Sequence, residues 1–169
     1  KSKKYKVGVV KNLISLIKDE RIKNLFDKLV EKLKYQGNEI IELEIDKIEI
    51  GVSAYYPIVY TEFFSGTRKF DGIKYGEKIE NTCGKEVLRR ILGGAEISKA
   101  EFAGKYYRRA LKAKKIIEAE FEAAFKKYDL IIMPVVPRLP HKLGEKISIE
   151  DSYAYDSCSV LANLAEIPA

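Results

Sequence analysis

The chain contains few of the residues that carry metal or covalent chemistry: one histidine, two cysteines and one methionine among 169 residues, and no tryptophan. Cys83 and Cys158 lie far apart, so there is no Cys-x-x-Cys pair, and a single histidine cannot complete a zinc site. His141 stands between Pro140 and Lys142, which argues against a Ser-His or Cys-His catalytic set. We therefore assign neither a metal centre nor a nucleophile, and Cys158, in an apolar run, is predicted to be a small core residue.

Long apolar runs and phosphate-binding loops are absent as well. No stretch approaches eighteen uncharged apolar residues, and no signal-peptide pattern precedes the first predicted strand, so we expect a cytoplasmic protein without membrane contact. Gly93 and Gly94 lie in a helical pattern that lacks the spacing of a phosphate-binding loop. We expect no cofactor in this chain.

The composition is that of an ordinary folded domain. With 46% apolar and 33% charged residues, the chain is neither disordered nor membrane-embedded. The net charge is +6, but the 31 basic residues are interleaved with 25 acidic ones, which favours solvated helix faces over a nucleic-acid surface. Abundant Lys, Glu and Ile with a single Gln resemble the composition of thermophile proteins. Because the chain lacks an initiator Met and stops without a helix cap, we expect residues 1–169 to form a single partial domain of a longer protein.

The apolar spacing of the first third predicts an α/β fold. A strand is expected over 5–10 and another over 39–45. Between them a helix starts near Asp19, which can accept hydrogen bonds from the first turn, and ends at Gly37. A strand, helix and strand with short connections predict parallel pairing through a right-handed crossover.

The rest of the chain alternates helical patterns with turns. Pro57 is tolerated in the first turn of a helix, Gly93-Gly94 is expected to break a helix, and Ser98 to Glu101 match a capping box that opens the next one. The apolar run after Asp129 is typical of a buried strand. The predicted elements are a helix over 53–69, a turn at 70–72, a short helix over 86–92, a long amphipathic helix to about 128, a strand over 130–133, an extended proline segment over 134–140 and a helix over 149–164.

Short segments of distinctive residue types follow one another in a particular order. They are Lys6 to Lys11, Tyr55-Tyr56 with Glu62, Phe70 to Gly76, Glu86 to Leu92, Tyr106-Tyr107, Asp129 with Pro134 and Pro137, Leu143 to Glu145, Tyr153 to Asp156 and Asn163 to Ala165. In this order they resemble the C-terminal part of the amidase-signature family, in particular the amidase subunits of tRNA-dependent amidotransferases. The resemblance covers nearly the whole chain and implies a mixed β-sheet flanked by helices.

The resemblance implies hydrolysis of glutamine by a nucleophilic serine, which a second serine in a cis peptide bond and a lysine activate. A non-proline cis bond costs about 3 kcal/mol, so a family keeps one only where a site demands it. The chain has no Ser-Ser pair, and these three residues are therefore expected upstream of Lys1. No catalytic residue is assigned within the chain, and the isolated chain is expected to be inactive.

Three positions match the family's contacts with the glutamine substrate: Tyr55, Arg90 and Asp156. Arg90 suits the α-carboxylate because a guanidinium can grip it with two parallel hydrogen bonds. Asp156 suits the α-ammonium, and the hydroxyl of Tyr55 could orient the substrate. The alternatives are an ordinary ion pair for Arg90, packing alone for Tyr55, and Arg89 in place of Arg90 if the helical register differs.

The family also implies partners. The parent protein would work with amidotransferase subunits B and C, and its ammonia would convert Glu-tRNA(Gln) or Asp-tRNA(Asn) into Gln-tRNA(Gln) or Asn-tRNA(Asn) in protein biosynthesis. Charged tRNA would be bound through the complex, with ATP and Mg²⁺ at the partner subunit. Two alternatives stay open: part of a stand-alone amidase acting on small amides, and a non-catalytic basic module that binds RNA or a partner.

Overall fold

The computed structural model describes residues 3–169; Lys1 and Ser2, which the expected domain also includes, lie outside the described residues. Two compact units make up the chain. The first contains the residues up to Val52 together with Lys115–Ala169, and the second contains Ser53–Lys114. The single partial domain over 1–169 stays a prediction. Within residues 3–169, no helix combines the length and apolar character needed to cross a bilayer.

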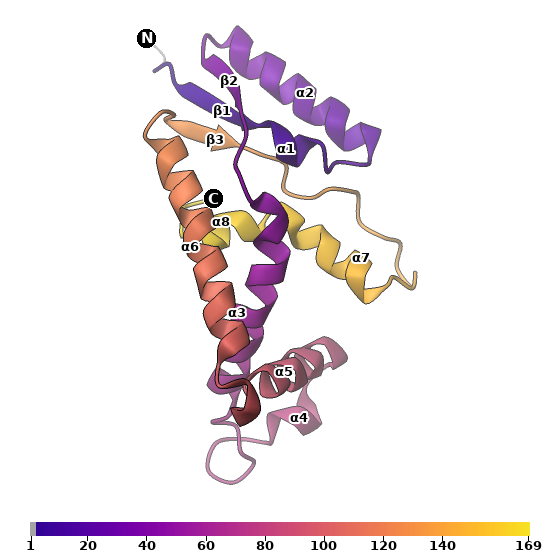
Figure 1. The fold of residues 1–169 in the computed structure, drawn as a ribbon. Helices are drawn as coiled ribbons and strands as arrows, with labels where there is room; N and C mark the ends of the chain where they lie inside the picture. Colours follow the sequence, from indigo (N-terminus) through magenta and orange to yellow (C-terminus); the bar gives the residue numbers. More distant parts are fainter. Residues whose placement is uncertain (1–2) are drawn as a thin grey trace. The chain divides into compact units, whose positions relative to one another are not determined.

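A three-stranded parallel sheet forms the centre of the first unit (Figure 1). Its strands are β1 (Lys6–Val10), β2 (Glu39–Leu43) and β3 (Leu130–Ile132). In the order β2-β1-β3, Val7 of β1 is opposite Ile40 on one side and Leu130 on the other. Val7, Val9 and Val10 are almost fully buried, as expected for a central strand covered on both faces. The α/β class and the parallel crossover are confirmed, and all three strands run in the same direction.

The crossover from β1 to β2 runs through α1 (Lys11–Ile14) and α2 (Glu20–Tyr35). Asp19 caps α2 as predicted, since its side chain accepts a hydrogen bond from the backbone N–H of Arg21 at 2.9 Å. Hydrogen bonds from the side chain and the backbone of Arg21 lower the pKa of Asp19 to about 2. Gly37, with φ of 85°, adopts the left-handed conformation that turns the chain into β2.

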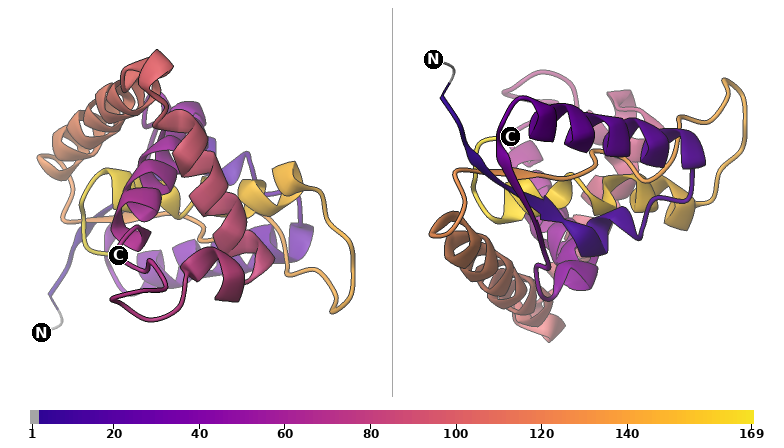
Figure 2. Two further views of the ribbon diagram at one scale, coloured as in Figure 1. Left: turned by 90° about the horizontal axis from the view of Figure 1, so that it is seen from below. Right: turned by 90° about the horizontal axis from the view of Figure 1, so that it is seen from above.

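Helices cover both faces of the sheet: α2 and α8 (Val160–Leu164) lie on opposite sides of it (Figure 2). Phe121 and Leu161 are fully buried in this core. The predicted helix over 149–164 is wrong as a single element, because the chain forms α7 (Ile149–Ala154), the 3₁₀ turn η3 (Tyr155–Ser157) and then α8. The Ser159 hydroxyl donates to the carbonyl oxygen of Asp156 at 3.4 Å, competing for an acceptor that a continuous helix would use.

The strand β3 lies at an edge of the sheet, so the prediction of a buried strand is wrong. Leu130 is 46% exposed, and Ile131 and Ile132 are half-buried. Among the residues that the structure describes, β3 pairs only with β1. Its start is fixed by Asp129, whose carboxylate accepts from the backbone N–H of Lys6 at 2.8 Å. An apolar run identifies a strand but not its place in the sheet.

The second unit is helical. Its elements are most of α3 (Gly51–Thr67), α4 (Ile79–Thr82), α5 (Lys85–Ile97), η2 (Ala100–Phe102) and the first half of α6 (Lys105–Phe125); η1 (Ile48–Ile50) precedes α3 in the first unit. Because α3 begins at Gly51, Pro57 lies inside the helix and not in its first turn as predicted. Proline has no N–H, so the carbonyl of Ser53 loses its helical donor there.

The prediction that Gly93-Gly94 would end a helix is wrong, since α5 runs through both residues. A Cβ atom at Gly94 would lie 2.1 Å from the backbone oxygen of Tyr60 and 2.5 Å from the Cβ of Phe64. A Cβ atom at Gly93 would lie 2.6 Å from the ring of Tyr60. The glycines are therefore needed for the close approach of α5 to α3, which outweighs their poor helix propensity of about 1 kcal/mol each.

The capping box predicted at Ser98 to Glu101 is also wrong. Ser98 is the residue that ends α5, and the chain then passes through η2. Ala103 and Gly104 both have positive φ, 42° and 70°, and this left-handed step delays the start of α6 to Lys105. The end of α5 at Ser98 and the left-handed turn at Ala103 and Gly104 thus prevent the capping box that the sequence pattern predicts. The predicted amphipathic stripe of the long helix is confirmed only in part: Ala110, Ile117, Phe121 and Ala124 are buried, whereas Tyr106 and Phe125, expected on the same stripe, are 44% and 40% exposed.

The predicted turn at 70–72 is confirmed and is held by one carboxylate. Asp71 Oδ1 accepts from the backbone N–H groups of Ile73 and Lys74, each at 2.9 Å, and of Tyr75 at 3.3 Å. These hydrogen bonds hold the pKa of Asp71 below its usual value. Gly72, with φ of 75°, supplies the left-handed residue that such a turn requires.

The substitution Gly94→Ala tests the close approach of α5 to α3. The new methyl would meet the backbone of α3, and we expect the free energy of unfolding to fall by about 2 kcal/mol. Gly66→Ala is the matched control, because a Cβ there has no neighbour within 4 Å and should raise stability by up to about 1 kcal/mol. Urea unfolding of the two variants checks both; an unchanged midpoint for Gly94→Ala would contradict the packing.

Candidate functional site

Arg90 lies on α5 and is braced by a carboxylate one turn earlier. Its Nε donates to Glu86 Oε1 at 3.2 Å, and Glu86 also pairs with Arg89. The Arg90 side chain is 31% exposed. Within residues 3–169, its two terminal nitrogens make no hydrogen bond, so they are the atoms that could bind a carboxylate. The ion pair expected as the alternative is present, yet it occupies only one edge of the guanidinium.

The charge of Arg90 is secured by its surroundings. Partial burial acts to lower the pKa of Arg90, but the hydrogen bond and charge of Glu86 outweigh it. Tyr56 and Tyr60 raise the pKa further, and the net result lies above the usual value. Arg90 is therefore a permanent cation.

Tyrosines of α3 lie on the side of α5 that carries Arg90. Gly94 comes one turn after Arg90 and packs on the backbone of Tyr60, so Arg90 shares the face of α5 that is turned toward α3. The rings of Tyr55 and Tyr56 meet edge to face at 5.4 Å, and those of Tyr56 and Tyr60 at 5.6 Å. Tyr55 packs, as its alternative interpretation held, but in the described part of the chain its hydroxyl has no hydrogen-bond partner. That hydroxyl can donate to a ligand.

Glu62 connects α3 to the start of α6. The hydroxyl of Tyr107 donates to Glu62 Oε1 at 2.9 Å. This hydrogen bond, followed by partial burial and the charge of Glu62, raises the pKa of Tyr107. Glu62 therefore supports the helix pair.

Asp156 lies in η3 of the first unit and is half-buried. The segment around it is held by Arg138, whose guanidinium stacks on the ring of Tyr155 at 4.6 Å and donates to the backbone oxygen of Asp151 at 3.0 Å. The Tyr155 hydroxyl donates to the carbonyl oxygen of Leu139. The proline segment thereby fixes the short helical turn that carries Asp156.

The structure places Tyr55 and Arg90 together in the second unit and Asp156 in the first. Sequence reasoning missed the two residues that position them, Glu86 and Arg138. The i, i+4 spacing of Glu86 and Arg90 is a signal for the first. Arg138 meets Tyr155 only through the fold, so no local pattern could have revealed it. Binding of glutamine by the three residues stays a prediction.

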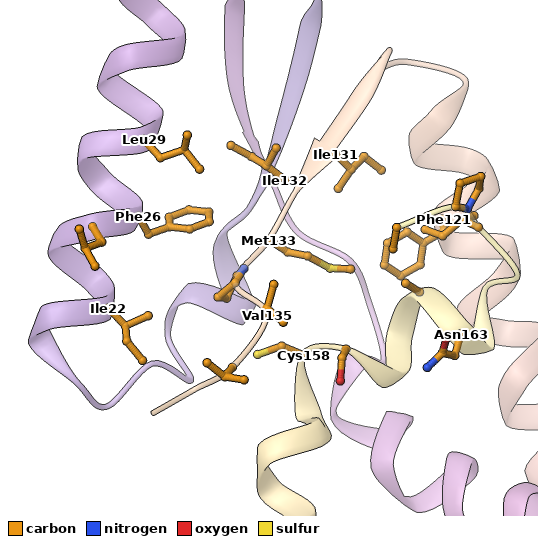
Figure 3. A pocket seen from close by; sticks show the side chains of 18 of the residues that line it. Ile22, Phe26, Leu29, Phe121, Ile131, Ile132, Met133, Val135, Cys158 and Asn163 are labelled. Atoms are coloured by element: carbon orange, nitrogen blue, oxygen red, sulfur yellow. The ribbon is translucent and has the colours of Figure 1, made fainter. Parts of the chain in front are cut away.

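An apolar hollow of about 690 Å³ runs along β3 in the first unit (Figure 3). Figure 3 shows Leu29, Phe26 and Ile22 of α2 on one side, Phe121 of α6 on the other, and Ile132, Met133, Val135 and Cys158 between them. Asn163 and Ser159 supply the polar side chains of its lining. A zwitterion would find no charge to pair with here, so the hollow suits apolar side chains and not glutamine.

Cys158 and His141 belong to the first unit, whereas Arg90 and Tyr55 belong to the second. Cys158 is fully buried, which confirms it as a core residue, and burial raises the pKa of its thiol. His141 is exposed, and its ring lies 6.3 Å from that of Tyr155. Among residues 3–169, no group of three or more His, Cys, Asp or Glu side chains could hold a metal ion.

Comparison with known proteins gives one family. The model of the Amidase family matches residues 1–169. The chain is 50% identical over 163 residues to the A subunit of a glutamyl-tRNA(Gln) amidotransferase from Methanococcus maripaludis, covering 96% of this chain and 38% of that protein. It is 46% identical over 167 residues to the protein of the same name from Methanocaldococcus jannaschii, again covering 38% of it. The chain thus spans somewhat more than a third of the length of these relatives.

Solved structures agree with these relatives. The crystal structure of the glutamyl-tRNA(Gln) amidotransferase A subunit from Thermotoga maritima matches with a TM-score of 0.72 and 27% identity, over 95% of this chain and 33% of that one. A crystal structure of an amidase matches with a TM-score of 0.73 and 18% identity, over 98% and 37% of the two chains, and shows a shared fold.

The burial of Cys158 predicts unequal thiol reactivity. In a Cys83→Ser variant of the chain, a polar disulfide reagent should react with Cys158 at least on the order of 100-fold more slowly than in urea, because the buried thiol must first be exposed. In a Cys158→Ser variant the half-buried Cys83 should react much faster than Cys158 does in the first variant. Equal rates in the two folded variants would show that the core around Cys158 opens readily.

Proposed function

The chain belongs to the amidase family, and on that premise we propose that it is the C-terminal, glutamine-recognising part of a glutamyl-tRNA(Gln) amidotransferase A subunit. The observation that supports this most directly is the 50% identity over 163 residues to a relative of that name. The parent protein hydrolyses glutamine and supplies the ammonia for amidation of Glu-tRNA(Gln) or Asp-tRNA(Asn). A stand-alone amidase on small amides is less well supported, since the amidase structure is only 18% identical.

Recognition of glutamine requires one cation and one anion, because the free amino acid is a zwitterion. Arg90 supplies the cation, and its two terminal nitrogens are directed to the α-carboxylate while Glu86 holds Nε. Glu86 thus sets the orientation of the guanidinium and reduces the entropy lost on binding. Tyr55, on the neighbouring helix α3, donates its hydroxyl to the substrate.

Asp156 supplies the anion for the α-ammonium group, and Arg138 with Tyr155 holds its turn in place. An amide inside a protein chain presents neither charge. It would offer no α-carboxylate to the terminal nitrogens of Arg90 and no α-ammonium group to Asp156, so the pair selects free glutamine.

In this proposal, the catalytic residues and the other components of the reaction lie outside residues 1–169. The nucleophilic serine, the cis-serine and the lysine lie upstream of Lys1, and the parent works with amidotransferase subunits B and C in the cytoplasm. Charged tRNA reaches the complex through these partners, and ATP and Mg²⁺ act at the partner subunit. The relatives' name supports the tRNA-dependent reaction, and the assignment of individual partners rests on the family resemblance.

The role of Arg90 can be tested in the full-length protein in complex with its partners. Arg90→Gln should lower kcat/KM for glutamine hydrolysis by on the order of 10- to 100-fold, because a charge-assisted hydrogen-bond pair to the carboxylate is lost. Arg89→Gln is the matched control, since Arg89 pairs with the same Glu86 from an adjacent position and should leave kcat/KM within about twofold.

A second substrate distinguishes the loss of carboxylate binding by Arg90 from a general effect of the substitution on the fold. With 4-aminobutanamide, which lacks the α-carboxylate of glutamine, Arg90→Gln should change kcat/KM little. An equal loss on both substrates would mean that Arg90 maintains the fold and does not read the carboxylate. A larger effect of Arg89→Gln would move the role to Arg89.

Because the proposed nucleophile lies upstream of Lys1, we predict that the 169-residue chain alone has no glutaminase activity. Ammonia release would be measured with the purified chain at high glutamine concentration, with the full-length protein as the positive control. Turnover by the isolated chain would overturn the placement of the nucleophile upstream of Lys1.

A further inference from the structure

The positive charge of the chain is concentrated in one unit. Residues 53–114 contain 13 Lys and Arg against 7 Asp and Glu, a net charge of +6, which equals the net charge of the whole chain. The first unit accordingly has as many acidic as basic residues. The interleaving of charges expected from the whole sequence therefore describes the first unit and not the second.

Within the second unit, the cations gather on the first two turns of α6. Lys105, Arg108, Arg109 and Lys112 are all exposed. At 100° per residue, their spacing of three, four and seven places them on one side of the helix. Together they line a hollow of about 290 Å³, and we call these four residues the α6 basic patch. No acidic residue occurs between Glu101 and Glu118.

Within residues 3–169, the four patch residues have no carboxylate partner, unlike several basic residues elsewhere in the chain. Lys34 pairs with Glu31 and Lys99 with Glu96 along their own helices, at 3.0 and 2.7 Å. In the part of the chain that the structure describes, none of the four patch residues forms an ion pair within 4 Å. The nearby Glu62 is hydrogen-bonded to Tyr107, which lies on the opposite side of α6. Four like charges thus stay uncompensated around one hollow.

We propose that the α6 basic patch is a docking surface for the phosphate backbone of RNA. The patch extends about 10 Å along the helix, a length over which one strand of a duplex presents about three phosphates. Tyr106 borders the patch, is 44% exposed and offers an aromatic face to an unpaired base.

An acidic protein is a poorer match for this surface. Lysine is depleted in protein–protein interfaces, and the patch brings two lysines and two arginines together with no apolar residue among the four. The identity of the RNA as tRNA rests on the proposed function, in which charged tRNA is brought to the complex.

The test uses the full-length protein in complex with its partner subunits. The double variant Arg108→Gln/Arg109→Gln removes two patch charges, and Lys34→Gln/Lys99→Gln removes two exposed charges elsewhere. Binding of labelled tRNA(Gln) is measured at several salt concentrations, and glutaminase activity without tRNA is measured alongside. We expect the patch variant to lose on the order of tenfold in affinity and about two units in the slope of log K against log salt. The control variant should match the wild type, and glutaminase activity should be unchanged in both.

The outcomes separate the two proposals. If the wild-type complex amidates charged tRNA but the patch variant keeps its affinity and salt slope, the docking surface is overturned and the proposed function stands. If the patch variant fails to assemble with the partner subunits while the control assembles, the patch binds protein, and the RNA proposal is wrong. A wild-type complex that hydrolyses glutamine but neither binds nor amidates tRNA overturns both.

Discussion

Each backbone N–H or C=O group of a buried strand that lacks a hydrogen-bond partner costs about 1 to 3 kcal/mol of stability. The central strand β1, with Val7 and Val10 almost fully buried, avoids this cost by pairing with β2 on one edge and β3 on the other. This pairing joins segments from the two ends of the sequence. The proline segment that follows β3 contains Arg138, which holds the turn of Asp156. The placement of this candidate substrate-binding residue therefore depends on β1.

In the second unit, one close contact plays the corresponding role. Gly94 lets α5 approach the backbone of α3, and Arg90, one turn away, is thereby brought beside Tyr56 and Tyr60, whose rings meet edge to face. Glu86 then orients the guanidinium from its own helix. A larger residue at position 94 would separate the helices and move Arg90 away from Tyr55 and its neighbours. Glycine in mid-helix is thus a requirement of the site as much as of the fold.

The two proposals assign a small molecule to one surface of the second unit and a polymer to another. Arg90 is one braced cation on the helix face turned toward α3, a geometry suited to a single carboxylate. The α6 basic patch has four exposed cations without partners, a geometry suited to repeated phosphates. Family membership, shown over residues 1–169, links both to an amidase, while the chain spans only 38% of its archaeal relatives. In the proposed function, recognition therefore lies in this part of the protein and bond cleavage in another.

The sequence by itself determined the features that depend on neighbours along the chain: the cap at Asp19, the turn of Asp71 and the crossover that makes β1 and β2 parallel. The i, i+4 pair of Glu86 and Arg90, which our predictions missed, is a local feature of the same kind. Local hydrogen bonds and helical spacing are sufficient for these. The tertiary structure alone decided that α5 continues through Gly93-Gly94, that β3 is an edge strand and that Arg138 stacks on Tyr155. Each of these depends on which distant segment lies alongside, and a long-range contact can outweigh a local preference of about 1 kcal/mol.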